Sequence, residues 1–252
     1  MISFEFYIGI AFKMFSQKYY DSHHVFIRSV EVGLAGGFDF LTYSAVDFSV
    51  RYYEDCLFDF FCIPFPEGIK LATLKRKAEY LATRYAAKIA LQKHGCNSLP
   101  FLGADRAPVW PIGWKGSISH SNESGIVLIA PTHSGINPGV DVEYIPPHSM
   151  AEAADVFSSR LEQELIKASD IDYEMALLIV FSAKESLYKS LYPVTRTFLD
   201  FDVVSVCYID TQKKLILLTL NKTISTEYPK GKKITCHYIL FVEKIITFVA
   251  KL

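Results

Sequence analysis

The chain has 252 residues, half of them hydrophobic, and its 26 basic and 27 acidic residues give a formal net charge of −1. This composition supports a sizeable core and excludes long disorder, while the near balance of charge argues against bulk nucleic-acid binding, which needs a broad basic surface. The five cysteines lie in no C-x-x-C spacing, which argues against a zinc site or a disulfide framework.

The N-terminal stretch is apolar but lacks the basic region and small-residue cleavage site of a signal peptide. No apolar segment approaches the roughly 20 residues that a membrane-spanning helix needs. We therefore expect a cytoplasmic protein without stable membrane insertion.

The first half of the chain mixes strand and helix patterns. Residues 1–62 contain short apolar runs broken by glycines, which indicates strands and loops. From Leu71 to Ile89 apolar residues recur at three- and four-residue steps, which predicts a helix that ends near Gly95. Prolines and glycines over 100–116 predict a loop, and the apolar run 126–130 predicts a strand.

The turn-rich stretch 131–138 is the predicted connector between two halves, 1–137 and 138–252. Beyond it we expect, in order, a strand at 139–145, a helix near 160–169, a long helix from Tyr173 to Leu191 stopped by Pro193, and an antiparallel strand meander over 201–252. Both halves combine helix with strand, so the predicted fold class is α+β.

Three segments carry residues that are able to do chemistry. On the strand at 139–145, Asp141 and Glu143 share one face, and two carboxylates on one face suit a hard divalent cation. In the long helix, Glu185 and Lys189 are four residues apart and share a face. Taken separately, the first pattern is more typical of a solvated strand face, and the second of an ordinary ion pair.

The third segment is Gly116-Ser117-Ile118-Ser119-His120-Ser121. A turn glycine followed by alternating hydroxyls and a histidine could present donors to phosphate oxygens. A plain polar loop would look the same, and a single histidine is more often a hydrogen-bonded structural residue than a catalyst. No P-loop or G-x-G-x-x-G element is present.

The segments 139–143 and 181–189, taken together and in this order, resemble the paired signature of the phosphopantetheinyl transferase superfamily. The segments 76–84 and 106–120 resemble the branch of that superfamily that serves siderophore synthetases. The resemblance runs from about residue 64 to residue 192, roughly half the chain. One departure is Thr83, where the family often has glycine.

The resemblance implies two similar α/β halves related by pseudo-twofold symmetry, and a monomer. The half 1–137 would carry the residues that bind the nucleotide of coenzyme A, and the half 138–252 the metal-binding and catalytic acids. The implied reaction is the Mg²⁺-dependent transfer of 4′-phosphopantetheine from coenzyme A to a serine of a carrier protein, with release of 3′,5′-ADP. The branch implies peptidyl or aryl carrier domains of a nonribosomal peptide siderophore synthetase as acceptors, and an acyl carrier protein stays an alternative.

The resemblance also implies roles for single residues. Asp141, Glu143 and Glu185 would hold Mg²⁺, and Glu185 would be the general base, acting directly or through a metal-bound water. Lys184 and Lys189 would contact phosphates, and Ser119 and His120 would bond the pyrophosphate or the 3′-phosphate. The 3′-phosphoadenosine end would be bound by three arginines, Arg76, Arg84 and Arg106.

Two other functions stay open on the residues alone. A metal-dependent phosphohydrolase could use the same acids with water as the nucleophile, and it would release phosphate or nucleotide from coenzyme A without any carrier. In a non-catalytic binding module the acids and bases would form only surface pairs, so Mg²⁺-dependent binding of coenzyme A would be absent. The four ordered segments favour transfer over both.

Overall fold

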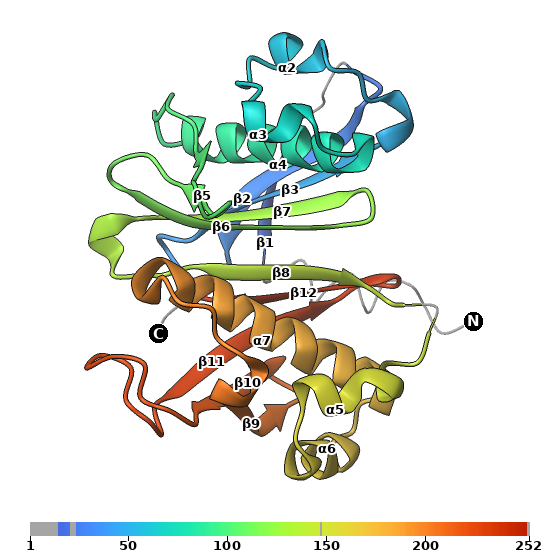
Figure 1. Ribbon diagram of the computed structural model, residues 1–252, viewed down its shortest axis with the longest axis vertical. Coiled ribbons are helices and arrows are strands. Elements are labelled where there is room, and N and C mark those ends of the chain that lie inside the picture. Colours follow the sequence, from blue (N-terminus) through green and yellow to red (C-terminus); the bar gives the residue numbers. More distant parts are fainter. Residues whose placement is uncertain (1–14, 21–23, 147, 251–252) are drawn as a thin grey trace. The chain divides into compact units, whose positions relative to one another are not determined.

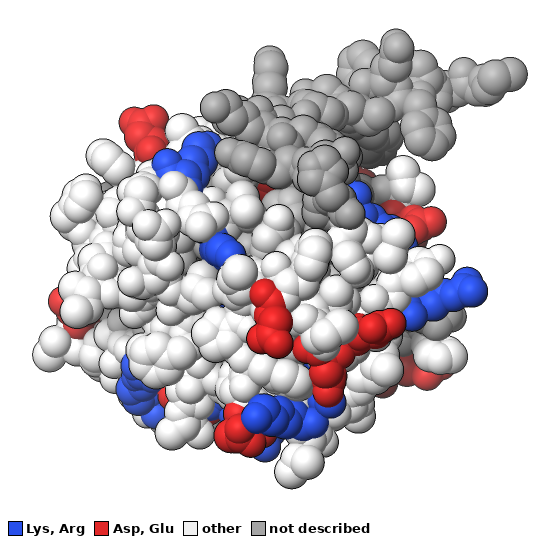
Figure 2. Space-filling model, turned by 90° about the horizontal axis from the view of Figure 1, so that it is seen from above, with Lys and Arg blue, Asp and Glu red and all other residues white. Residues whose placement is uncertain are grey.

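The computed structural model describes residues 15–20, 24–146 and 148–250, which separate into two compact units on either side of the bond between Ile136 and Asn137. Among these residues, no helix has the length and apolar character to cross a membrane. On the face drawn in Figure 2, acidic and basic side chains are scattered among uncharged ones, in keeping with the balanced composition.

The N-terminal unit contains a five-stranded antiparallel sheet and one long helix (Figure 1). The strand order is β1 (Phe15–Tyr20), β2 (Ile27–Ala35), β3 (Thr42–Phe48), β7 (Ser124–Pro131) and β6 (Trp114–Ser121). Helix α4 (Leu74–Gln92) packs across β3 and β7. The smaller elements are a 3₁₀ turn (Val50–Tyr52), α2 (Leu57–Phe60), α3 (Glu67–Lys70), the hairpin strands β4 (Phe101–Leu102) and β5 (Pro108–Val109), and a second 3₁₀ turn (Thr132–Ser134).

Helix α4 has an N-cap threonine before its first residue and a glycine shortly after its last. The Thr73 side chain accepts a hydrogen bond from the Arg76 N–H, which is an N-cap contact. Gly95, just beyond the helix, has a φ of +74°, in the left-handed region that glycine tolerates. Thr83 lies against Gly125 of β7, where an added Cβ would stand 2.7 Å from the Thr83 Cγ2. The threonine in this helix is therefore accommodated by a glycine in the facing strand.

The segment 116–121, for which the sequence left a plain polar loop open, is part of strand β6, and the loop predicted over 100–116 overlaps the first residues of that strand. The strand pairs with β7 from Trp114 to Ser121. Its residues alternate between the two faces of the sheet, because side chains of a strand do so with a period of two. Gly116 is required here, since a Cβ would stand 2.4 Å from the Trp110 ring. The serine–apolar alternation was the strand signal that the turn residues before it obscured.

The C-terminal unit has a second five-stranded antiparallel sheet. Its strand order is β8 (Gly139–Tyr144), β12 (Lys244–Val249), β11 (Lys233–Leu240), β10 (Leu215–Leu220) and β9 (Val204–Asp210). The helical elements are a 3₁₀ turn (Met150–Ala153), α5 (Ala154–Phe157), α6 (Arg160–Lys167), α7 (Tyr173–Thr195) and a 3₁₀ turn (Phe201–Val203). The predicted strand at 139–145, both predicted helices and the meander are confirmed.

Pro193 does not stop α7, which continues to Thr195 and ends at Arg196 in the left-handed conformation. A proline removes one backbone donor and presses on the preceding turn. In the last turn of a helix few bonds remain to be lost, so the helix accommodates it.

The two units share one plan. In each, the strand that precedes the long helix pairs with the last strand of the unit, β3 with β7 and β8 with β12. The long helix then packs across that pair, α4 on two inner strands of the first sheet and α7 on the edge strand β8 and its neighbour β12 in the second (Figure 1). This confirms the α+β fold with two similar halves.

Candidate functional site

Strand β8 and helix α7 approach closely at Gly139. A Cβ at this position would stand 2.0 Å from the backbone oxygen of Ser186 and 2.7 Å from the Ser190 Cβ. Only glycine permits this distance, because backbone atoms of a packed helix cannot move aside cheaply. The approach brings the side chain of Asp141, two residues further along β8, against the same helix.

The carboxylate of Asp141 is held from two sides. Ser182 donates to its Oδ2 at 2.7 Å, and the Lys189 Nζ lies 2.6 Å from its Oδ1. Asp141 is only 3 % exposed, so its charge needs such partners. Two residues that the sequence analysis selected from different segments, Asp141 and Lys189, are therefore in direct contact.

Glu185 lies one helical turn before Lys189 and belongs to the same electrostatic group. Burial raises the pKa of Glu185; the Lys189 ammonium lowers it, and the Asp141 carboxylate raises it further. Glu143 lies two residues beyond Asp141, on the same face of β8, and is partly exposed. The unit thus gathers carboxylates around one ammonium group.

This arrangement suits a divalent cation bound through oxygen. Mg²⁺ is usually held by one or two carboxylates together with phosphate oxygens and waters. The carboxylates of Asp141 and Glu185 repel one another, and the Lys189 ammonium, which contacts Asp141, offsets part of that repulsion. Within the described ranges no three His, Cys, Asp or Glu side chains lie close enough to form a metal site by themselves. The full set with Glu143 therefore stays a prediction.

Lys184 has a different environment from the one expected of a phosphate ligand. Its ammonium lies 2.7 Å from the Glu162 Oε1 and donates to the Phe157 carbonyl oxygen, with the Lys184 side chain 2 % exposed. Burial lowers the pKa of Lys184, and Glu162 raises it. Lys184 follows Ser182 by two residues, which on a helix is a rotation of about 200° about the axis. The Lys184 side chain therefore points away from Asp141. Phosphate contact would require this pair to separate.

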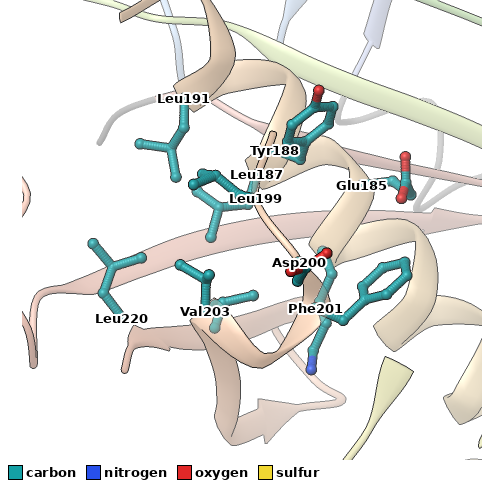
Figure 3. Close-up of a pocket in the computed structure, with 11 residues that line it drawn as sticks. Glu185, Leu187, Tyr188, Leu191, Leu199, Asp200, Phe201, Val203 and Leu220 are labelled. Atoms are coloured by element: carbon teal, nitrogen blue, oxygen red, sulfur yellow. The ribbon is translucent and has the colours of Figure 1, made fainter. Parts of the chain in front are cut away.

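A narrow hollow lies beside Glu185 on the other side of α7. It is lined by residues of α7, by the segment that leads to β9 and by Leu220 of β10. In Figure 3 the aliphatic side chains Leu191, Leu199, Val203 and Leu220 gather on one side of this hollow, and Glu185 stands at the other. Lys184 and Asp200 also line it, and the hollow has room for about one water molecule.

In the N-terminal unit, Arg76 of α4 and His120 of β6 are in contact, with 2.7 Å between the Arg76 Nη1 and the His120 Nε2. A guanidinium only donates, so Nε2 accepts and the imidazole proton is on Nδ1. Nδ1 faces the Glu79 Oε2 at 3.4 Å. Burial raises the pKa of Glu79, and the Arg76 charge lowers it. Glu79, which no sequence motif indicated, lies beside two of the predicted ligands, Arg76 and His120.

Arg84 is a buried cation on the same helix. It is 5 % exposed, its guanidinium lies 4.6 Å from the centre of the Tyr80 ring, and its Nε is buried without a hydrogen-bond partner among the described residues. Burial lowers the pKa of Arg84, and Arg76 lowers it further. A buried guanidinium with an unsatisfied donor is suited to an incoming anion.

Two other predicted ligands lie apart from this group. Ser119 is next to His120 in β6, so its side chain points to the opposite face of the sheet, where it is buried. Arg106 is exposed in the turn between β4 and β5, with a φ of +66°.

Comparison with known proteins identifies the chain in both units. The family model described as "4'-phosphopantetheinyl transferase N-terminal domain" matches residues 65–130, and the one described as "4'-phosphopantetheinyl transferase superfamily" matches residues 137–239. The chain is 37 % identical over 146 residues to enterobactin synthase component D of Salmonella typhi, a match that covers 58 % of this chain and 60 % of that protein.

Two further relatives support the assignment. Enterobactin synthase component D of Escherichia coli K12 is 34 % identical over 152 residues, which cover 60 % of this chain and 72 % of that protein. The 4'-phosphopantetheinyl transferase PptT of Mycobacterium tuberculosis is 26 % identical over 151 residues, or 58 % of this chain and 65 % of that protein. The chain therefore belongs to the 4′-phosphopantetheinyl transferase superfamily, in the branch that includes enterobactin synthase component D.

Proposed function

We propose that this protein transfers 4′-phosphopantetheine from coenzyme A to a serine of a carrier protein and releases 3′,5′-ADP. The observation that carries the proposal is the contact between Asp141 and Lys189 beside Glu185, which joins the two signature segments of the family in one charged group. The names of the relatives support the reaction class. We further propose that the reaction takes place in the cytoplasm.

The acceptors that we propose are peptidyl or aryl carrier domains of a nonribosomal peptide siderophore synthetase. The support is the likeness to proteins named enterobactin synthase component D. The nucleophile is then a serine of the partner, so this chain needs no catalytic serine of its own.

Asp141, Glu143 and Glu185 would hold Mg²⁺, which when bound supplies charge neutralisation and orientation for the pyrophosphate of coenzyme A. Lys189 places a second positive charge beside Asp141 and would contact the phosphates. Glu185 would be the general base, acting directly or through a water held at the site.

The reaction moves one proton and exchanges one phosphorus–oxygen bond. The serine hydroxyl gives its proton to Glu185, and the serine oxygen forms a bond to the β-phosphorus of coenzyme A. The bond from that phosphorus to the bridging oxygen breaks, and 3′,5′-ADP leaves. Lys189 stabilises the charge that develops on the phosphoryl oxygens.

The nucleotide end of coenzyme A would be held by Arg76, Arg84 and His120. Arg84 is the strongest candidate for the 3′-phosphate, because its buried guanidinium has an unsatisfied donor. Ser119, Arg106 and Lys184 stay predicted ligands that would have to change their surroundings on binding.

The proposal is tested with Asp141→Asn, which keeps the shape of the side chain and removes its charge. Transfer of a fluorescent pantetheine arm from a coenzyme A analogue to an apo peptidyl carrier domain should fall by at least ~10³-fold, while the far-UV circular dichroism spectrum stays that of the wild type. Full transfer by a folded Asp141→Asn protein would refute the assignment of this site. Release of 3′,5′-ADP by the wild type without a carrier would instead favour the phosphohydrolase.

A further inference from the structure

Helix α7 carries three serines at intervals of four residues, Ser182, Ser186 and Ser190, and each is 0 % exposed. Residues four apart lie on the same face of a helix, and this face packs on β8 and β12. Buried hydroxyls are costly unless they are bonded, and alanine would pack here without that cost. We therefore expect each of these hydroxyls to have a specific hydrogen-bond partner.

Ser182 contacts the carboxylate of Asp141 directly, and Ser186 is linked to it through Thr247 of β12 and Ser182. Ser182 lies 2.7 Å from the Asp141 Oδ2 and 2.9 Å from the Thr247 Oγ1, which lies 2.7 Å from the Ser186 Oγ. The antiparallel register places Thr247 directly opposite Asp141. All members of this chain of hydroxyls are buried.

The proton of the Ser182 hydroxyl has a fixed direction. A carboxylate only accepts, so Ser182 uses its one proton on Asp141. Thr247 is then the donor in its bond with Ser182, and Ser186 donates to the Thr247 carbonyl oxygen at 2.9 Å. The bond from Thr247 to Ser182 polarises the bond from Ser182 to Asp141.

The two oxygens of Asp141 consequently have different partners. Oδ2 is held from the buried side by Ser182, and Oδ1 faces Lys189 at 2.6 Å. A carboxylate bonded on both oxygens in this way has a fixed rotamer, with Oδ1 directed towards Lys189.

We propose that Ser182, supported by Thr247, is a positioning residue that orients the Asp141 carboxylate so that Oδ1 meets the divalent cation. The inference rests on the proposed function, because it concerns the same cation. It assigns a role to a side chain that neither binds the cation nor touches coenzyme A.

The test compares Ser182→Ala with Ser186→Ala. Both changes remove one buried hydroxyl that bonds Thr247, one turn apart on the same helix face, but only Ser182 contacts Asp141. The readout is the dissociation constant of Mg²⁺, measured by titration calorimetry in the presence of coenzyme A and without an acceptor, so that no turnover occurs.

Ser182→Ala should weaken Mg²⁺ binding by about 10-fold or more, the usual effect of losing a partner of a metal ligand, and Ser186→Ala by less than about 2-fold. Thr247→Val, which keeps the shape and removes the hydroxyl, should fall between them, with Thr247→Ser near the wild type. Urea unfolding of each variant separates this effect from a loss of stability.

Equal Mg²⁺ affinities for Ser182→Ala and Ser186→Ala would overturn the inference while leaving the proposed function intact, provided that the wild type binds Mg²⁺ with coenzyme A and modifies a carrier. A wild type that does neither would overturn both.

Discussion

Breaking the buried pair between Lys184 and Glu162 should destabilise the protein strongly. The two charges are 2.7 Å apart, with side chains 2 % and 5 % exposed, and at an effective dielectric constant of about 20 they attract by ~6 kcal/mol. Desolvation offsets much of that attraction. Removing one partner leaves the other charge buried, so Glu162→Gln should lower the free energy of unfolding by about 3–5 kcal/mol.

Glu162→Gln retains a carbonyl oxygen able to accept from the Val206 N–H, a bond that Glu162 makes at 2.9 Å. Its amide nitrogen would replace the Oε2 that accepts from the Ser159 N–H at 2.9 Å in the capping box of α6, so the perturbation combines the loss of charge with the loss of that contact. Lys184→Met removes the other charge and keeps the length of the side chain. In a double-mutant cycle the two changes together should cost less than the sum of the separate costs, because neither charge remains unpaired.

The assay is urea unfolding of the wild type, both single variants and the double variant, together with the KM for coenzyme A. If the role of Lys184 is structural, Lys184→Met lowers the free energy of unfolding and leaves the KM for coenzyme A within about 3-fold of the wild type. A cost below ~1 kcal/mol for Glu162→Gln would refute the reasoning about the pair. A KM raised by about 10-fold or more in a stable Lys184→Met protein would instead support the phosphate contact that the sequence predicted.

Three other changes have defined outcomes. Gly139→Ala should cost more than ~3 kcal/mol, because its Cβ would meet the Ser186 oxygen at 2.0 Å, whereas Gly135→Ala, with open space around it, should cost about 1 kcal/mol; equal unfolding midpoints would contradict this. Burial lowers the pKa of His237 below its usual 6.5. Its contribution to the free energy of unfolding is therefore fully present above pH 6.5 and is lost as the pH falls through the lowered pKa, by at most about 1.4 kcal/mol per pH unit. His237→Leu should reduce this loss, measured by urea unfolding at pH 7.5 and 5.5. Arg84→Gln should raise the KM for coenzyme A by about 10-fold or more and change that for 3′-dephospho-coenzyme A little; an equal rise for both would exclude the 3′-phosphate as the partner of Arg84.

The regular elements could be predicted wherever one period was uninterrupted. The apolar steps from Leu71 to Ile89 and the alternation beyond residue 201 led to the right helix and strands. Strand β6 was missed because prolines and Gly113, which precede it, are turn residues, and because Ser117 and Ser119 are polar although buried. Its burial depends on tertiary packing, which local composition does not report.

The candidate site could be predicted only in part, because tertiary packing decides which side chains meet. Resemblance to a family selected Asp141 and Lys189, and the structure brings them together. It does not bring Lys184 to them, because that side chain has a carboxylate partner from α6 that no spacing along the chain reveals. Ser182 was missed although serines recur every four residues in an otherwise apolar helix, a pattern that indicates buried hydroxyl partners. Identifying Thr247 as that partner required the register of β8 against β12.

The most direct test of the proposed transfer is the intact mass of an apo peptidyl carrier domain after incubation with this protein, coenzyme A and Mg²⁺. We predict a gain of one phosphopantetheine group, abolished by EDTA and absent when the acceptor serine of the carrier is replaced by alanine. No gain on peptidyl, aryl or acyl carriers, with the protein folded by circular dichroism, would contradict the proposed activity.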